Sequence, residues 1–151
     1  DEMNVSPKNL GIEITESVFT SDYSVINCIL GELREKGMII AIDDFGTGFS
    51  SLSYIKRIPF DVIKIDKAFL SDLEIDAKSR GLVKEIIKLA HILETYVIIE
   101  GVQEYEQIKL LQGMDADCIQ GYYYSEPLRP EDYLRFINDN KFERGKKGAG
   151  K

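Results

Sequence analysis

The chain has 151 residues, 44% of them hydrophobic and 30% charged, which suits one globular domain with its own core. Its net charge of -7 and its pI near 4.8 argue against a general nucleic-acid-binding protein or a protein held on anionic membranes. No apolar run approaches the roughly 20 residues of a membrane-spanning helix. We therefore expect neither DNA as a partner nor a membrane segment in this chain, although a bound metal ion could still attract an anionic ligand.

The cysteine and histidine content does not suit a Cys/His metal site. The two cysteines, Cys28 and Cys118, are far apart in the sequence, and the only histidine is His91. Both cysteines lie in apolar surroundings, so we expect them to be buried as small hydrophobic residues in a reducing compartment. His91 falls within a predicted helix, where we expect it to pack or to form hydrogen bonds rather than to act in catalysis.

In chain order, the sequence predicts strands and helices in alternation. Runs typical of strands occupy residues 10–15, 38–42, 60–65, 96–99 and 118–124. Apolar spacing predicts helices over residues 21–36, 52–58, 76–93 and 104–112, and a last helix that begins at Pro130. In the longest helix the predicted apolar stripe consists of Leu82, Ile86, Leu89, Ala90 and Leu93. Residues 1–9 form a polar lead-in, and residues 141–151 are a basic, glycine-rich segment that we expect to be disordered.

This alternation predicts a parallel α/β fold. Polar residues fall at or near the C-terminal end of each predicted strand, namely Glu13, Asp43, Asp66, Glu100 and Gln120. Barrel enzymes assemble their chemistry at that rim from several strands, so the pattern favours a (β/α) barrel over a doubly wound sheet. A closed eight-stranded barrel takes roughly 250 residues, which is more than this chain offers. The chain is therefore either an open sheet complete in itself or a part of a larger barrel.

Two adjacent acids follow the apolar strand over residues 38–42. Asp43 and Asp44 precede a loop that contains Gly46 and Gly48. Two carboxylates at the mouth of an apolar strand are costly unless a charged group binds there, and hard divalent cations prefer carboxylate oxygens. The alternative is an ordinary turn whose acids face water, since aspartate and glycine are common in turns.

A lysine inside a strand is an unusual core residue, so we expect Lys64 to face a polar interior with Asp66 on the same strand face. The alternative for Lys64 is a side chain that extends along the strand edge to reach solvent. Glu100 has an alternative as well, because an acid ahead of a helix is favoured by the helix dipole. Gln120 could be simply a polar strand end.

Five stretches, taken in order, resemble the C-terminal part of an EAL domain, the cyclic-di-GMP phosphodiesterase family. The stretches are IEITES, AIDDFGTGFSSLSYI, FDVIKID, VIIEGVQ and QGYYYSEP, and the resemblance runs from Leu10 to about Asn138. It implies a TIM-like (β/α) barrel of the EAL type that is present only in part. About five βα units would span residues 10–140, and the N-terminal strands of the barrel would be missing.

The resemblance also implies two divalent metal ions, Mg2+ or Mn2+, and a water that opens cyclic di-GMP to linear pGpG. The implied metal ligands are Glu13, Asp43, Asp44 and Glu100. The implied catalytic residues are Lys64, Glu100 and Asp66. The implied substrate-binding residues are Gln120 and Tyr122, whose ring could stack on a guanine. Glu16 would brace the Gly46–Ser51 loop.

Two departures from the family pattern favour a second function. The Glu-Ala-Leu motif and the asparagine of the following strand are absent from the sequence, and Gln103 stands where the family usually has glutamate. The alternative is a catalytically inactive EAL-type module that binds cyclic di-GMP or another protein. An unrelated metal-dependent barrel enzyme would share the acids but not the order of the motifs.

The resemblance implies partners and a location as well. The family implies a homodimer contact through the region of the Gly46–Ser51 loop and sensor or GGDEF domains in the parent protein. It also implies the bacterial cytoplasm, with room for a membrane anchor in the parent protein.

Overall fold

The computed structural model describes residues 4–20, 23–46 and 55–139, and within them a parallel sheet is the central element. The strands are β1 (Gly11–Thr15), β2 (Ile39–Phe45), β3 (Val62–Ile65), β4 (Tyr96–Ile99) and β5 (Cys118–Ile119). The helices are α1 (Tyr23–Glu35), α3 (Ala77–Ile92), α4 (Tyr105–Gln112) and α5 (Pro130–Asp139), with short 3-10 turns η1 (Pro7–Asn9), η2 (Glu16–Thr20) and η3 (Lys67–Leu70).

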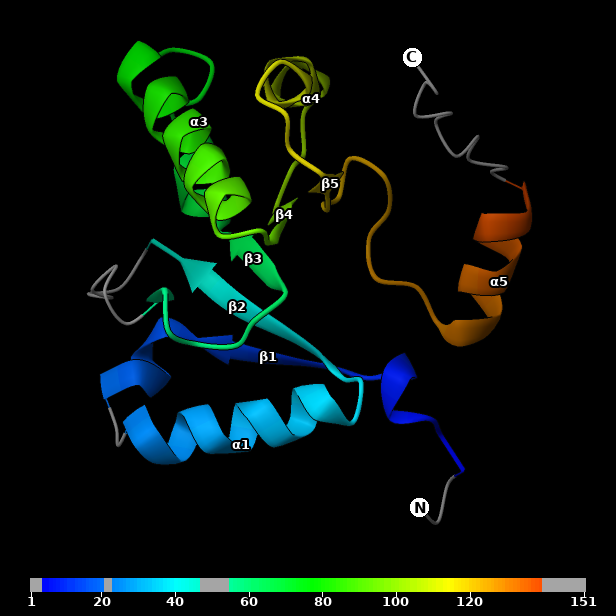
Figure 1. Ribbon diagram of the computed structural model, residues 1–151. Helices are drawn as coiled ribbons and strands as arrows, with labels where there is room; N and C mark the ends of the chain where they lie inside the picture. The colour runs from blue at the N-terminus through cyan, green and yellow to red at the C-terminus, as the bar shows by residue number, and fades with distance from the viewer. Residues whose placement is uncertain (1–3, 21–22, 47–54, 140–151) are drawn as a thin grey trace, which may run out of the picture.

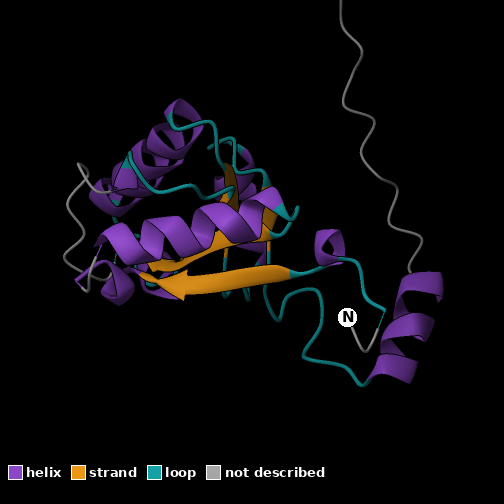
Figure 2. Cartoon of the chain, turned by 60° about the horizontal axis from the view of Figure 1, so that its bottom comes forward, coloured by secondary structure: helices purple, strands orange, loops and turns teal. Residues whose placement is uncertain are grey.

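The five strands pair in chain order, β1-β2-β3-β4-β5, and every pairing is parallel. Each strand therefore lies beside the previous one. Figures 1 and 2 show α1, α3 and α4 gathered on one side of a curved sheet, while α5 stands apart at the end of an extended segment. This is the winding of consecutive βα units around part of a barrel, as the sequence predicts.

Alternation along the strands separates a core face from a second face that no helix in the described residues covers, called here the uncovered face. Ile40, Ile42, Ile63 and Ile65 have no exposed surface and form the core beneath the helices. Their neighbours along the strands point to the other face, which carries both apolar and charged residues. There Ile39 and Tyr96 are about half exposed, at 49% and 46%. A concave groove of about 710 Å³ lies along this face, lined at one end by Glu13 and Lys64.

The predicted apolar stripe of α3 is confirmed in part, since Ala90 is buried and Ile86 and Leu93 pack against the core, but the most buried side of the helix is rotated from it. The residues of this helix that are buried are Val83, Ile87 and Ala90, whereas Leu82 is 53% exposed. Both sets repeat at three and four residues, so spacing alone cannot choose between them. Asp76 caps the start of the helix, because its side chain accepts hydrogen bonds from the backbone N–H groups of Lys78 and Ser79, and this cap helps fix which face meets the sheet.

The phase of α3 gives a mild stability prediction. Ile87→Val should lower the free energy of unfolding by about 1 kcal/mol, because it removes a methyl group from a fully buried site. Leu82→Val should change it by less than about 0.5 kcal/mol, since that side chain is exposed. Urea unfolding of the two variants measures both values, and equal losses would contradict the assignment of the buried face.

Two predicted strands end at other residues than expected. β2 continues through Asp43 and Asp44 to Phe45, and β5 stops at Ile119 instead of reaching Tyr124. The chain turns after β5 because both backbone polar groups of Val102 form hydrogen bonds with it. The Val102 N–H donates to the Gln120 carbonyl, and the Tyr123 N–H donates to the Val102 carbonyl.

The environment of the cysteines differs from the predicted one. Both cysteines are exposed free thiols, so the prediction that they are buried is wrong. Cys28 lies on the outward side of α1, and Cys118 is in the short strand β5. Residues 52–54 of the predicted helix over residues 52–58 lie outside the described residues, and of the rest Ile55 is helical while residues 56–58 form a turn and a bend. Among the helices that the structure describes, none has the length and apolar character needed to cross a membrane.

Candidate functional site

A lysine among carboxylates forms the charged centre of the uncovered sheet face. The Lys64 Nζ lies 2.8 Å from Glu13 Oε2, 2.8 Å from Glu100 Oε1 and 3.4 Å from Asp43 Oδ1. These partners come from β1, from the residue after β4 and from β2, so the site exists only once four strand segments are assembled. The Lys64 side chain is only 7% exposed, whereas Glu13 stands at the solvent side and is 56% exposed.

The partners of Lys64 keep its ammonium charged. Burial alone lowers the pKa of Lys64, but hydrogen bonds to Glu100 and Glu13 and the nearby charge of Asp43 outweigh it, and the pKa is raised. Lys64 is therefore a cation at neutral pH. It can neutralise an anion but cannot accept a proton as a general base.

A β-bulge brings the two adjacent aspartates together. Between β2 and β3 the register advances from Ile42 to Phe45 on β2 while it advances only from Ile63 to Ile65 on β3. The extra residue lies at Asp43–Asp44, and Asp44 has a positive φ of 52°, a conformation that aspartate tolerates better than most residues. In a regular strand these neighbours would point to opposite faces. The alternation of side chains along a strand therefore does not predict that the two carboxylates lie together. The signal for it in the sequence is the pair of acids directly before a glycine turn.

The bulge creates a cluster of carboxylates. Oxygens of Asp43, Asp44 and Glu100 lie within 4.8 Å of one another, and all three residues are partly buried. An all-carboxylate donor set suits a hard divalent cation such as Mg2+ or Mn2+. The Lys64 ammonium already lies beside two of these carboxylates as a cation. The residues present therefore fit a positively charged ligand.

Glu16 and Asp66 both contact backbone near this cluster. Glu16 is 7% exposed, and its Oε1 accepts a hydrogen bond of 2.7 Å from the Gly46 N–H. The remaining residues of the Gly46–Ser51 loop lie outside the described residues. Asp66 caps η3, because its Oδ1 accepts a hydrogen bond of 2.8 Å from the Ala68 N–H. The ion pairs of Lys64 that the structure describes thus involve other strands instead of Asp66.

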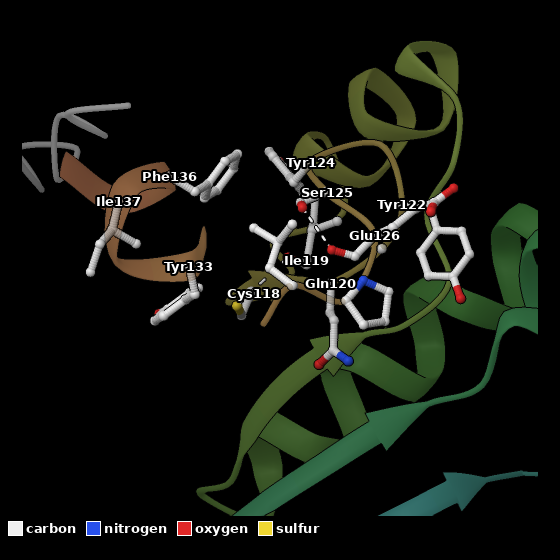
Figure 3. Close-up of a pocket in the computed structure, with 13 residues that line it drawn as sticks. Cys118, Ile119, Gln120, Tyr122, Tyr124, Ser125, Glu126, Tyr133, Phe136 and Ile137 are labelled. Carbon is white, nitrogen blue, oxygen red and sulfur yellow. Dashed lines mark hydrogen bonds between the residues drawn. The ribbon is translucent and has the colours of Figure 1, made fainter. Parts of the chain in front are cut away.

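Gln120 and Tyr122 line a separate cavity of about 740 Å³ between the turn after β5 and the helix α5. Figure 3 shows Tyr133, Phe136 and Ile137 of α5 on one side of it and Gln120 and Tyr122 directed away from them. None of the charged residues around Lys64 lines this cavity. The sequence-predicted residues therefore form two groups. One is the carboxylate–lysine cluster, and the other is the pair Gln120 and Tyr122, which lines the second cavity.

The family model of the EAL domain matches residues 1–127 of the chain. The chain belongs to the EAL domain family. Among curated relatives, the cyclic di-GMP phosphodiesterase PA2567 of Pseudomonas aeruginosa is 39% identical over 129 residues, which are 83% of this chain and 22% of that protein. The chain spans about a fifth of the length of the curated relatives it matches.

Solved EAL structures share the fold. The PaMucR phosphodiesterase in its c-di-GMP complex is 34% identical to this chain with a TM-score of 0.82, over 88% of this chain and 54% of that chain. The BlrP1 protein of Klebsiella pneumoniae, solved as a manganese/cy-diGMP complex, is 32% identical with a TM-score of 0.76, over 83% of this chain and 32% of that chain. The five-stranded sheet of this chain is therefore part of a TIM-like EAL barrel.

Proposed function

We propose that this EAL chain is part of a metal-dependent phosphodiesterase that hydrolyses cyclic di-GMP to linear pGpG. The observation that carries the proposal is the cluster of Asp43, Asp44 and Glu100 beside the nearly buried ammonium of Lys64. A site with three carboxylates and one ammonium retains a negative charge, which suits divalent cations and, through them, a phosphodiester. The complexes named for PaMucR and BlrP1 support this choice of ligand and metal.

Each residue of the cluster has a role in this proposal. Asp43, Asp44, Glu100 and Glu13 hold two divalent ions, Mg2+ or Mn2+, through carboxylate oxygens. When bound, such ions supply a water of lowered pKa and stabilise negative charge on the phosphate. Lys64 offsets charge on a phosphate oxygen, because its ammonium is charged at neutral pH and is held in place by Glu13 and Glu100. The reaction adds one water across one phosphodiester bond.

The surrounding residues position the loop and the ligand. Glu16 holds the start of the Gly46–Ser51 loop through the Gly46 N–H, and Asp66 supports Lys64 indirectly by capping η3. Gln120 and Tyr122 contact a guanine at the next strand end. We further propose a homodimer contact through the Gly46–Ser51 loop, sensor or GGDEF domains in the parent protein, and a cytoplasmic location. The name of the relative MucR, a bifunctional diguanylate cyclase/cyclic di-GMP phosphodiesterase, supports a parent protein of that kind.

A receptor without turnover is the second candidate, and Gln103 favours it. Its backbone N–H donates to Gln107 at the start of α4, and its neutral side chain adds no carboxylate after Glu100. A module of this kind would bind cyclic di-GMP and retain it.

The two candidates differ in their products. Incubation of the chain with cyclic di-GMP and Mn2+ should yield pGpG by chromatography, and EDTA should stop the reaction, because the carboxylates then hold no divalent ion. Isothermal titration with cyclic di-GMP in the presence of Ca2+ measures binding separately. Formation of pGpG that EDTA stops would support the phosphodiesterase, and binding without pGpG would support the receptor.

A further inference from the structure

The 3-10 turn η3 is fixed to the end of β3. It follows β3 directly after Asp66, whose Oδ1 accepts a hydrogen bond of 2.8 Å from the Ala68 N–H. The Asp66 carbonyl accepts a second hydrogen bond, of 3.1 Å, from the Phe69 N–H. At the other end of the turn Leu70 is 3% exposed and packs in the core. The turn is therefore held at both of its ends.

Two side chains of η3 contact glycines that follow the strands on either side of β3. Gly46 comes directly after β2, and a Cβ at this position would lie 2.5 Å from Phe69 Cζ and 2.9 Å from Phe69 Cε2. Gly101 lies two positions after β4, and a Cβ there would overlap the Lys67 side chain. Both glycines have a positive φ, 90° and 70°. The tip of the Phe69 ring therefore lies against the Gly46 backbone, and η3 bridges the loops after β2 and β4.

These two loops adjoin the acids of the carboxylate cluster. Asp44 lies two positions before Gly46, and Glu100 directly follows β4. The bulge at Asp44 interrupts the regular pairing of β2 with β3. Beyond it the Gly46 N–H donates to Glu16 Oε1 at 2.7 Å, and the Phe69 ring lies against the same residue. Contacts with Glu16 and Phe69 therefore fix the chain just beyond the bulge.

We propose that Phe69 is a positioning residue that holds the loop after β2, so that Asp43 and Asp44 stay within ligand distance of Glu100. This step rests on the proposed function, in which these carboxylates bind divalent ions. Their oxygens lie within 4.8 Å of one another, and their charges repel in the absence of a metal ion. A site whose ligands are held in place binds its ion more tightly, because less ordering accompanies binding.

Phe69 also fills space, since its ring is partly buried against the core. The contact with Gly46 adds a second effect, because the ring is rigid and its tip lies against backbone atoms. A shorter apolar side chain would still cover the core but would no longer restrain Gly46. Loss of stability alone therefore does not test the proposal, whereas the affinity for a metal ion does.

Phe69→Leu should weaken Mn2+ binding by about tenfold, the smaller end of the loss found when residues that orient metal ligands are replaced. Leucine ends short of the position of Phe69 Cζ, so the contact with Gly46 is lost while the core remains covered. Isothermal titration with Mn2+ alone measures the affinity of the folded chain. Ile87→Val is the matched control, because it removes apolar volume from a fully buried site on α3 and should leave the Mn2+ affinity unchanged.

Backbone amide exchange measured by NMR in EDTA tests the same contact without metal. Glu16 should protect the Gly46 N–H in the unmodified chain, and Phe69→Leu should lower that protection by about tenfold through local opening, whereas Ile87→Val should not. If no Mn2+ binds to the unmodified chain, the proposed function is contradicted, and the Gly46 amide still decides the role of Phe69.

Unchanged protection of Gly46 in Phe69→Leu would overturn the proposal, and so would an unchanged Mn2+ affinity. Phe69→Tyr keeps the test open if the leucine variant fails to fold. Its hydroxyl extends from Cζ, the ring atom nearest to Gly46, so it should displace Gly46 and also weaken Mn2+ binding. A Phe69→Tyr variant that binds Mn2+ as tightly as the unmodified chain would show that the carboxylate cluster does not depend on this contact.

Discussion

Replacing Lys64 by methionine is expected to lower the free energy of unfolding by about 3 kcal/mol in metal-free buffer. The ammonium is nearly buried and lies within 3.4 Å of three carboxylates, two of which, Asp43 and Glu100, are themselves only 25% and 18% exposed. Methionine keeps the length and apolar stem of the side chain but leaves these carboxylates to repel one another. Urea unfolding in EDTA measures the loss.

The same substitution should strengthen the stabilisation by divalent cations. Mn2+ should raise the stability of Lys64→Met more than that of the unmodified chain, because the ammonium no longer competes for Asp43 and Glu100. Lys88→Met is the matched control: its Nζ also lies close to a carboxylate, Glu85 Oε1 at 2.6 Å, but both side chains are more than half exposed. That variant should lose less than about 0.5 kcal/mol. Equal losses in the two variants would show that burial of the Lys64 cluster contributes nothing.

The order of strands and helices could be predicted from the sequence because it depends on local information. The apolar run before Asp43 and the alternation around Glu13 are each complete within a few residues, and the structure has β2 and β1 there. Parity along one strand also placed Lys64 on a polar face. Its partners could not be read in the same way, because Glu13, Asp43 and Glu100 come from other strands and their distances depend on register.

The features that were missed depend on tertiary contacts. The phase of α3 depends on which of two equally spaced stripes meets the sheet, and Val83 and Ile87 face inward because the cap and the sheet fix the rotation. At Asp44 the bulge interrupts the regular strand pairing and the residue takes a positive φ. A pattern of apolar residues does not predict such a conformation. The turn after Ile119 depends on two hydrogen bonds to Val102, which lies 17 positions earlier in the sequence.

The turn after β5 gives the second large prediction. Gly121→Ala should lower the free energy of unfolding by about 3 kcal/mol, the upper part of the range for overpacking. A methyl group on Gly121 would overlap the backbone nitrogen and carbonyl oxygen of Val102, and these are the atoms that bond to Gln120 and Tyr123. Backbone atoms cannot move aside as a flexible side chain can, so the turn must separate from the Glu100–Val102 segment.

Gly81→Ala provides the matched control, because the same substitution should there have the opposite sign. Gly81 lies inside α3, and no atom is within 4 Å of the position that its Cβ would take. Alanine in a helix interior should raise stability by roughly 0.5–1 kcal/mol. Urea unfolding of both variants gives the two signs, and amide exchange at Val102 and Tyr123 reports the turn directly. If Gly121→Ala were as stable as the unmodified chain with both amides still protected, close packing of this turn on Val102 could not be what ends β5 and presents Gln120 beside Glu100.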